Sequence, residues 1–439
     1  MGDRSLRQGA SAPFYVLLKG VEGEMEQLAR LIASLPEVGE LEQIVRFGTG
    51  PAAVSGVSGV HRAMLAAALR RRTGRPLAVL CADEQEVRRM AADLAVLTGE
   101  EPVALFAREW RLRARVSASH SFEQERLDAL CRMAFGKAEI VVAAVDGLLQ
   151  RTPPPAALRD AVLTLRLGGE YDLHELAGRL SASGYVRTAQ VEGAGQYAVR
   201  GGILDVYPLM GSPVRVEFFD TEIDAMGEFD VATQRRTKNI DSLTVLPATE
   251  LLPDAAEGGR DAMLARMEHA LSQLEKKAGT EKNAAVLRGD VERLREGLPL
   301  DGADRCLAAA YPTVSCAADY FPPGTLVLVS ESGRVLERAG GYAFEQGEDV
   351  RQLLEEGVLA GPFAALTIDT EELTRRLRAF PVVQCDSLPT SRYLMPPRAL
   401  LSINARQLPS YGGSLETAAA DMEHYLAAGS GVLVLCGNA

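Results

Sequence analysis

Short apolar runs alternate with amphipathic segments in the first third of the chain. The runs at 77–81, 103–106 and 140–144 have the length and composition of buried strands. Other segments repeat their apolar residues at helical spacing, which predicts helices. Two of them, 22–35 and 63–71, precede the first run, and Pro36 follows directly after the first of these two as a stop signal. The other two, 85–97 and 123–135, lie between the runs. Strands that alternate with helices predict a parallel sheet with right-handed crossover connections.

The same alternation resumes after residue 248. Two amphipathic segments predict core-packing helices, and two apolar runs with a further amphipathic segment extend the α/β pattern. In chain order these five segments are 261–277, 283–296, 326–330, 366–368 and 371–380.

Residues 161–247 interrupt the α/β pattern with a strand, a helix and several short strands, which predicts a small α+β domain inserted into the first domain. The expected order is a mobile tail at 1–13, the first half of the α/β domain at 14–160, the insertion, the second half at 248–386, a Pro- and Ser-rich linker at 387–397, and a further unit at 398–439. That last unit is expected to be the start of a truncated α/β domain, because its strand at 431–436 has no following helix to cover it.

The insertion contains three short strands, at 196–199, 203–207 and 214–219. In the third strand, period-2 alternation places Val214, Val216 and Phe218 on one face and Arg215, Glu217 and Phe219 on the other. Arg200 can lie on the same outer side. From spacing alone two interpretations stay open: Phe219 is covered by the following loop, or Phe219 and the arginines form a protein-docking surface.

A glycine-bearing turn before the helix at 63–71 has the frame of a phosphate-binding loop, G-x-x-x-x-G-K-[ST]. Gly56 keeps the first glycine and Gly59 lies within the loop, but His61 replaces the second required glycine, Arg62 the lysine and Ala63 the magnesium-binding hydroxyl. We therefore expect no nucleotide hydrolysis here.

The run at 326–330 resembles the strand that precedes a magnesium-binding carboxylate in nucleotide hydrolases. Ser330 stands where the Asp is expected and Glu331 is left alone. Both halves of the nucleotide site are altered, so we predict no catalytic residue, no metal and no cofactor in this chain.

Composition narrows the class of protein. The 439 residues are 47% hydrophobic and carry a net charge of −12, which indicates folded domains and argues against non-specific DNA clamping as the main activity. Six scattered cysteines predict neither a zinc site nor a disulfide framework. A cytoplasmic protein without a membrane partner is expected, since no apolar run approaches the length of a membrane span.

The segment 196–235 also carries a family resemblance. Its runs QYAVRGGILDVYP and VRVEFFD, followed by EID and by FD and TQR, resemble the UvrB-homology module of bacterial transcription-repair-coupling factors. The resemblance implies a degenerate P-loop, RecA-like (helicase-like) α/β domain whose insertion binds the excinuclease protein UvrA. The implied contact residues are Arg200, Arg215 and Phe219, which favours the docking interpretation.

The resemblance also implies partners and activities elsewhere in such a protein. RNA polymerase and double-stranded DNA would bind downstream regions, ATP and Mg²⁺ would serve motor domains there, and a C-terminal domain would mask the UvrA-binding face. Two alternatives remain: a helicase or excinuclease component in which Arg62 and Glu331 substitute for the lost groups, or a metabolic α/β enzyme.

Overall fold

The computed structural model describes residues 14–17, 30–48, 50–113, 121–300, 302–404, 408, 411–430 and 432–435. The expected tail at 1–13 and most of the expected helix at 22–35 lie outside this part of the chain. Residues 30–33 are helical, and Pro36 begins a further helix, α2 (Pro36–Phe47), as its first residue. Proline suits this position because the first turn of a helix needs no donor there.

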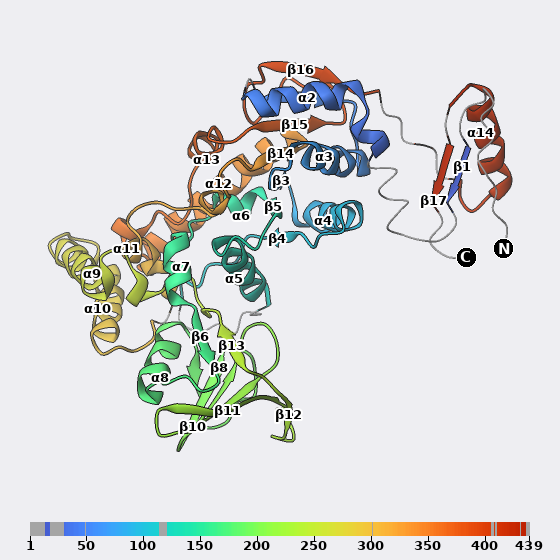
Figure 1. The fold of residues 1–439 in the computed structure, drawn as a ribbon. Helices are drawn as coiled ribbons and strands as arrows, with labels where there is room; N and C mark the ends of the chain where they lie inside the picture. Colours follow the sequence, from blue (N-terminus) through green and yellow to red (C-terminus); the bar gives the residue numbers. More distant parts are fainter. Residues whose placement is uncertain are drawn as a thin grey trace.

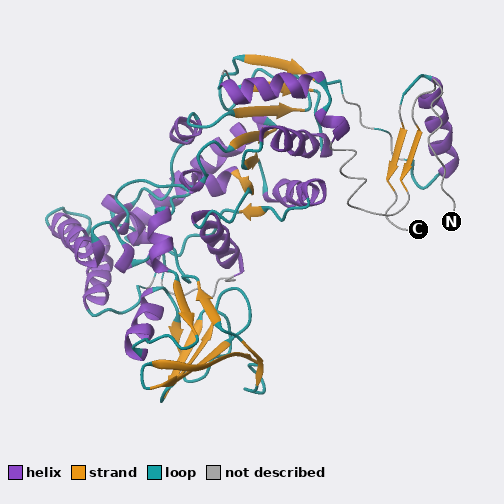
Figure 2. Cartoon of the chain, viewed as in Figure 1, coloured by secondary structure: helices purple, strands orange, loops and turns teal. Residues whose placement is uncertain are grey.

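A parallel sheet of seven strands organises the larger part of the molecule (Figures 1 and 2). Every neighbouring pair in it is parallel, as the alternating pattern predicts. In spatial order the strands are β16 (Ala399–Ser402), β2 (Ala52–Ser55), β15 (Val382–Asp386), β14 (Leu326–Ser330), β3 (Leu77–Cys81), β5 (Ile140–Ala144) and β4 (Val103–Leu105).

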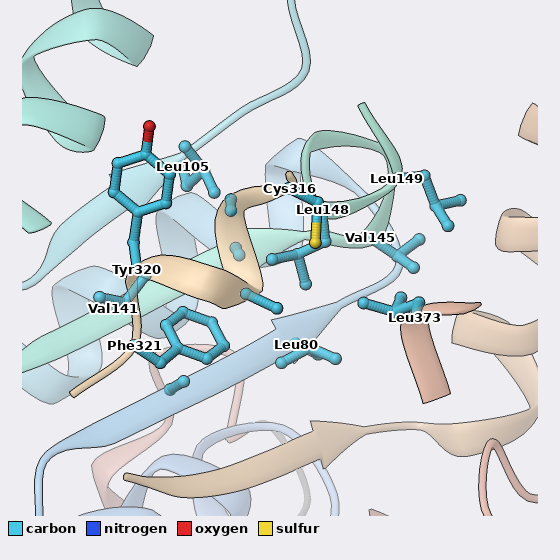
Figure 3. Close-up of a cluster of buried hydrophobic side chains, with 14 of the residues drawn as sticks. Leu80, Leu105, Val141, Val145, Leu148, Leu149, Cys316, Tyr320, Phe321 and Leu373 are labelled. Atoms are coloured by element: carbon cyan, nitrogen blue, oxygen red, sulfur yellow. The ribbon is translucent and has the colours of Figure 1, made fainter. Parts of the chain in front are cut away.

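Two hydrophobic cores lie on the two faces of this sheet. Alternate residues of β3 enter different cores: Val79 packs with one and Leu80 with the other. The Val79 core receives α2, α3 (Val60–Thr73) and α4 (Glu84–Thr98). The Leu80 core, part of which is drawn in Figure 3, receives α5 (Ser121–Ala134), α6 (Val145–Leu149), α7 (Pro155–Ala161), α12 (Ser332–Glu356) and α13 (Thr370–Leu377).

Three strands of the sheet differ from the sequence prediction: β2 was not predicted, and β15 and β16 were assigned to connections or to another unit. The segment after α13, for which no strand was predicted, forms β15 between β14 and β2. Its apolar pattern is hidden by Gln384, which is fully buried and whose amide both donates to and accepts from the backbone of Met395, at 2.7 and 3.0 Å. A buried polar side chain whose hydrogen bonds are satisfied in this way leaves no trace in a hydropathy pattern.

The prediction that a new unit begins at residue 398 is wrong for its first strand, β16. β16 pairs with β2 and is therefore an edge strand of the seven-stranded sheet, and residues 387–397 connect two strands of one domain. The short run at 366–368 does not join the sheet, because Thr367 forms only an isolated bridge with Gln150.

The insertion forms a separate small domain that projects from the sheet beyond α5 and α7 (Figure 1). It opens with β6 (Leu163–Arg166), closes with β13 (Ser242–Val245), and these two strands pair antiparallel. Between them lie α8 (Leu173–Ala182) and a second sheet with the spatial order β12 (Arg236–Asn239), β11 (Glu222–Phe229), β10 (Val214–Phe219), β9 (Ile203–Tyr207), β8 (Gln196–Arg200) and β7 (Val186–Arg187). The predicted strands are present; β7, β11 and β12 were not predicted.

Two smaller groups complete the described chain. The predicted helical pair is present as α9 (Gly259–Glu275) and α10 (Glu281–Arg295), which share a core with the short helix α11 (Leu307–Ala310). Near the chain ends, β1 (Phe14–Leu17) pairs in parallel with β17 (Val432–Leu435), and α14 (Leu415–Ala427) precedes β17. No helix within the described ranges is both long and apolar enough to cross a bilayer.

Candidate functional site: the outer face of the inserted domain and the altered nucleotide site

The outer face of the inserted sheet carries the residues that the alternation of β10 placed there. Val214 and Val216 are buried in the domain core and Phe218 packs against it, while Arg215 and Phe219 point away from that core. Phe219 is 77% exposed, so it is not covered by the following loop. A large exposed aromatic side chain at the end of a strand is suited to protein contact.

Backbone hydrogen bonds place Phe219 close to the end of β8. The amide of Phe218 donates to the carbonyl oxygen of Gly202 at 2.8 Å. Gly202 belongs to the two-glycine turn that directly follows Arg200. The structure thereby brings the ends of β8 and β10, with Arg200 and Phe219, into one neighbourhood.

Asp205 of β9 joins the two arginines. Its carboxylate accepts from Arg200 Nη2 at 2.8 Å and from Arg215 Nε and Nη2 at 2.7 and 2.9 Å. Asp205 is only 1% exposed. The sequence analysis missed this residue. A charged side chain inside the apolar strand Ile203–Tyr207 could have identified it, because a buried carboxylate needs a charged or hydrogen-bonding partner.

Arg215 is held by more than this ion pair. Its guanidinium also donates to the backbone and side-chain oxygens of Gln234, at 3.2 and 3.0 Å, and lies 4.8 Å from the ring centroid of Phe229. The hydrogen bond with Asp205 raises the pKa of Arg215. The face therefore combines a fixed internal cation, a half-exposed cation at Arg200 and an exposed aromatic side chain.

The glycine-bearing turn that the sequence predicts to be an altered phosphate loop lies between β2 and α3. Gly56 has a φ of +88°, and a Cβ there would lie 2.0 Å from the carbonyl oxygen of Ile403, so the segment after β16 packs directly against the loop. Gly59 (φ +51°) caps α3, and His61 lies in the first turn of that helix. Ala63 is fully buried in the core.

Arg62 is enclosed by carboxylates. It forms an ion pair with Glu331 and another with Glu86, whose Oε1 lies 3.3 Å from Arg62 Nη2. Ser330 donates its hydroxyl to the same Glu86 oxygen at 2.6 Å. Glu331, with a φ of +60°, also accepts from the backbone amide of Ser387 at 3.2 Å. Arg62 of the loop and Ser330 and Glu331 of the strand are thus brought together in one internal network, which does not include His61 or Ala63.

Asp386 is a further carboxylate beside this network that sequence reasoning missed, because its strand β15 was not recognised. It accepts from the backbone amide of Ser332 at 2.7 Å and from the Ser332 hydroxyl at 3.0 Å. Burial raises its pKa. Within the described residues, no group of three or more His, Cys, Asp or Glu side chains is arranged to hold a metal ion. Glu86, Glu331 and Asp386 instead accept hydrogen bonds from protein groups.

Comparison with known proteins gives matches to the UvrB interaction domain and to transcription-repair-coupling factors. Residues 163–251 match the UvrB interaction domain. The transcription-repair-coupling factor of Bacillus subtilis (strain 168) is 27% identical over 391 residues, which cover 88% of this chain and 33% of the relative. That of Staphylococcus haemolyticus (strain JCSC1435) is 30% identical over 244 residues, covering 53% of this chain and 20% of the relative.

These matches confirm the resemblance predicted from the segment 196–235. The chain spans about a third of the length of the Bacillus subtilis factor, at 33%, and less of the Staphylococcus haemolyticus factor. The insertion seen as β6 to β13, together with the few residues that follow it, is the part that matches the UvrB interaction domain.

Proposed function

We propose that this chain, which resembles the N-terminal part of transcription-repair-coupling factors, recruits UvrA through the outer face of its inserted domain. The match of residues 163–251 to the UvrB interaction domain supports this assignment. The observation that carries it is Phe219 beside Arg200: at 77%, it is the most exposed of the large apolar residues of the inserted domain.

The proposed role belongs to transcription-coupled nucleotide excision repair in the cytoplasm. A lesion-stalled RNA polymerase is the proposed target of the whole factor, and this chain supplies the link to UvrA. We assign polymerase binding, double-stranded DNA binding, ATP-driven translocation and the masking of the UvrA-binding face to other regions of such a factor.

We further propose that this chain holds neither ATP nor Mg²⁺. Arg62 is engaged by Glu331 and Glu86, and the segment after β16 lies against Gly56 where phosphate groups would need to approach. A ligand would have to break buried ion pairs before it could use the same groups. These residues do not fit a magnesium nucleotide.

A titration tests the recruiting role. Purified chain and purified UvrA should form a complex in calorimetry, and Arg200→Glu, which reverses one charge at the face, should weaken it strongly. A matched control is Arg295→Glu on α10, where the side chain is exposed and lies outside the inserted domain. Equal UvrA affinity of Arg200→Glu and wild type would reject this face as the docking site.

A second titration tests the proposed absence of nucleotide chemistry. The chain should neither bind Mg-ATP tightly nor release phosphate from it. Magnesium-dependent ATP turnover that disappears in Arg62→Ala would contradict this proposal and favour the alternative, a nucleotide-using helicase or excinuclease component.

A further inference from the structure

Asp205 lies at a buried position, where a carboxylate destabilises the fold unless charged or hydrogen-bonding groups pair with it. It lies on β9, directly opposite Ala198 of β8 and Arg215 of β10 in the register, and is 1% exposed. Its two oxygens accept three hydrogen bonds from the two arginines. A buried carboxylate is stable only when it is paired in this way, so Asp205 fixes both guanidinium groups at the centre of the face.

Arg215 is mostly an internal residue. Only 18% of its side chain is exposed, its donors are directed to Asp205 and Gln234, and the Phe229 ring lies against its guanidinium. A side chain with this many fixed contacts has little surface left for a partner. Its role is to hold Asp205, and through Asp205 to hold Arg200.

Arg200 and Phe219 are the groups that remain accessible. The Arg200 side chain is 48% exposed and Phe219 is 77% exposed. The two arginines and Asp205 together carry one net positive charge, and the nearby Glu217 is paired with Arg236 of β12. The face therefore offers one cation of fixed orientation and one aromatic side chain.

We infer that Asp205 is a positioning residue for partner recognition, and that the partner presents one carboxylate to Arg200 and an apolar recess to Phe219. The inference rests on the proposed function, since UvrA is the partner to which it applies. Charge complementarity specifies the acidic group, because one cation that is already oriented can bind one carboxylate with little further loss of side-chain freedom.

The substitution Asp205→Asn separates positioning from simple attraction. It makes the face more positive, so attraction alone would strengthen binding to an acidic partner. If Asp205 positions Arg200, UvrA affinity should instead fall about tenfold or more, since the oriented arginine becomes free to move. Binding that is unchanged or tighter would overturn the inference.

A second variant decides the matter if Asp205→Asn fails to fold, which a melting curve would reveal. Arg200→Lys keeps the charge at an exposed site but loses the planar fork that can pair with two carboxylates, so UvrA affinity should fall about tenfold. Its dependence on salt should stay close to that of wild type, whereas Arg200→Met should flatten this dependence by removing the charge. Unchanged affinity of Arg200→Lys would refute the oriented contact.

Arg236→Lys on β12 is the matched control, because Arg236 lies in the same sheet and pairs with Glu217. It should change UvrA affinity less than about twofold. The two proposals fail in different ways. Wild type that does not bind UvrA, or an Arg200→Glu variant that binds as well as wild type, rejects the proposed function; unaffected Asp205→Asn and Arg200→Lys, with Arg200→Glu still weakened, reject only this inference.

Discussion

Phe219 is the side chain that we expect to contribute most to binding of the proposed partner. It ends a strand whose alternate residues build the domain core, and a register irregularity between Glu217 and Phe218 precedes it. Burying its ring in a partner would remove a large apolar surface from water, and aromatic side chains of this kind dominate small interfaces.

We predict that Phe219→Ala weakens UvrA binding by about 2 kcal/mol, because the buried ring is lost from the interface. The thermal unfolding of the chain should hardly change, since the side chain is exposed in the free protein. Phe344→Ala is the matched control: Phe344 is 71% exposed on α12, outside the inserted domain. Equal losses in both variants, measured by calorimetry, would contradict a specific role for Phe219.

Some residue roles could be predicted from the sequence and others could not. Alternation along β10 was enough to place Arg215 and Phe219 on the outer face. It could not find Asp205 or Asp386, because their roles depend on partners brought close by the fold. Gln384 misled the strand prediction for the same reason, since its amide is satisfied by the backbone of Met395.

At the scale of elements, the N-terminal helices are tied together by a charge cluster. Glu42 of α2 accepts from Arg72 Nε of α3 at 2.6 Å and from Arg46 Nε at 2.8 Å. The hydrogen bond from Arg72 is the main cause that lowers the pKa of Glu42. The Glu42 carboxylate therefore stabilises the contact between α2 and α3 as long as it is ionised.

We predict that Glu42→Gln lowers the free energy of unfolding by about 1 kcal/mol at pH 7. A carboxyl group with a lowered pKa in the folded state contributes its stability above its unfolded pKa and loses it as the pH falls through the folded pKa. The difference between wild type and variant should therefore vanish in acid. Urea unfolding at several pH values measures it; a difference that persists unchanged in acid would refute an ionic contribution.

Elements with strong local patterns were predictable, and those defined by distant pairing were not. β3, β5 and β14 are continuous apolar runs buried on both faces, so their bounds follow from the sequence. β16 exposes alternate residues on the sheet edge, and its membership of the sheet depends on β2, which lies more than 300 residues earlier. Pairing across such a separation is not contained in any local pattern.

At the scale of the whole molecule, one buried carboxylate fastens the end of the insertion to the larger domain. Glu250, which is fully buried, follows β13 by a few residues. Its Oε1 lies 2.9 Å from Arg126 Nε of α5 and 2.7 Å from Arg108 Nε. Arg108 pairs in turn with Asp304, so the network also reaches the segment before α11.

We predict that Glu250→Gln lowers the free energy of unfolding by about 3 kcal/mol or more, because it leaves two buried arginines without their shared carboxylate. The single tryptophan, Trp110, has its ring centroid 4.8 Å from the Arg108 guanidinium, so its fluorescence reports on this region during urea unfolding. Glu292→Gln at an exposed position of α10 is the control. Similar unfolding midpoints for both variants would show that the network contributes little.

The antiparallel pairing of β6 with β13 has a practical consequence for the architecture. Because Leu163 lies opposite Val245, the chain enters and leaves the inserted domain at adjacent positions. A short turn could join these two positions in place of the inserted domain, and no strand of the seven-stranded sheet would be cut. We therefore expect the inserted domain to be removable or exchangeable as one unit, provided that Leu209, which packs against the core of the larger domain, is replaced by a residue of similar size.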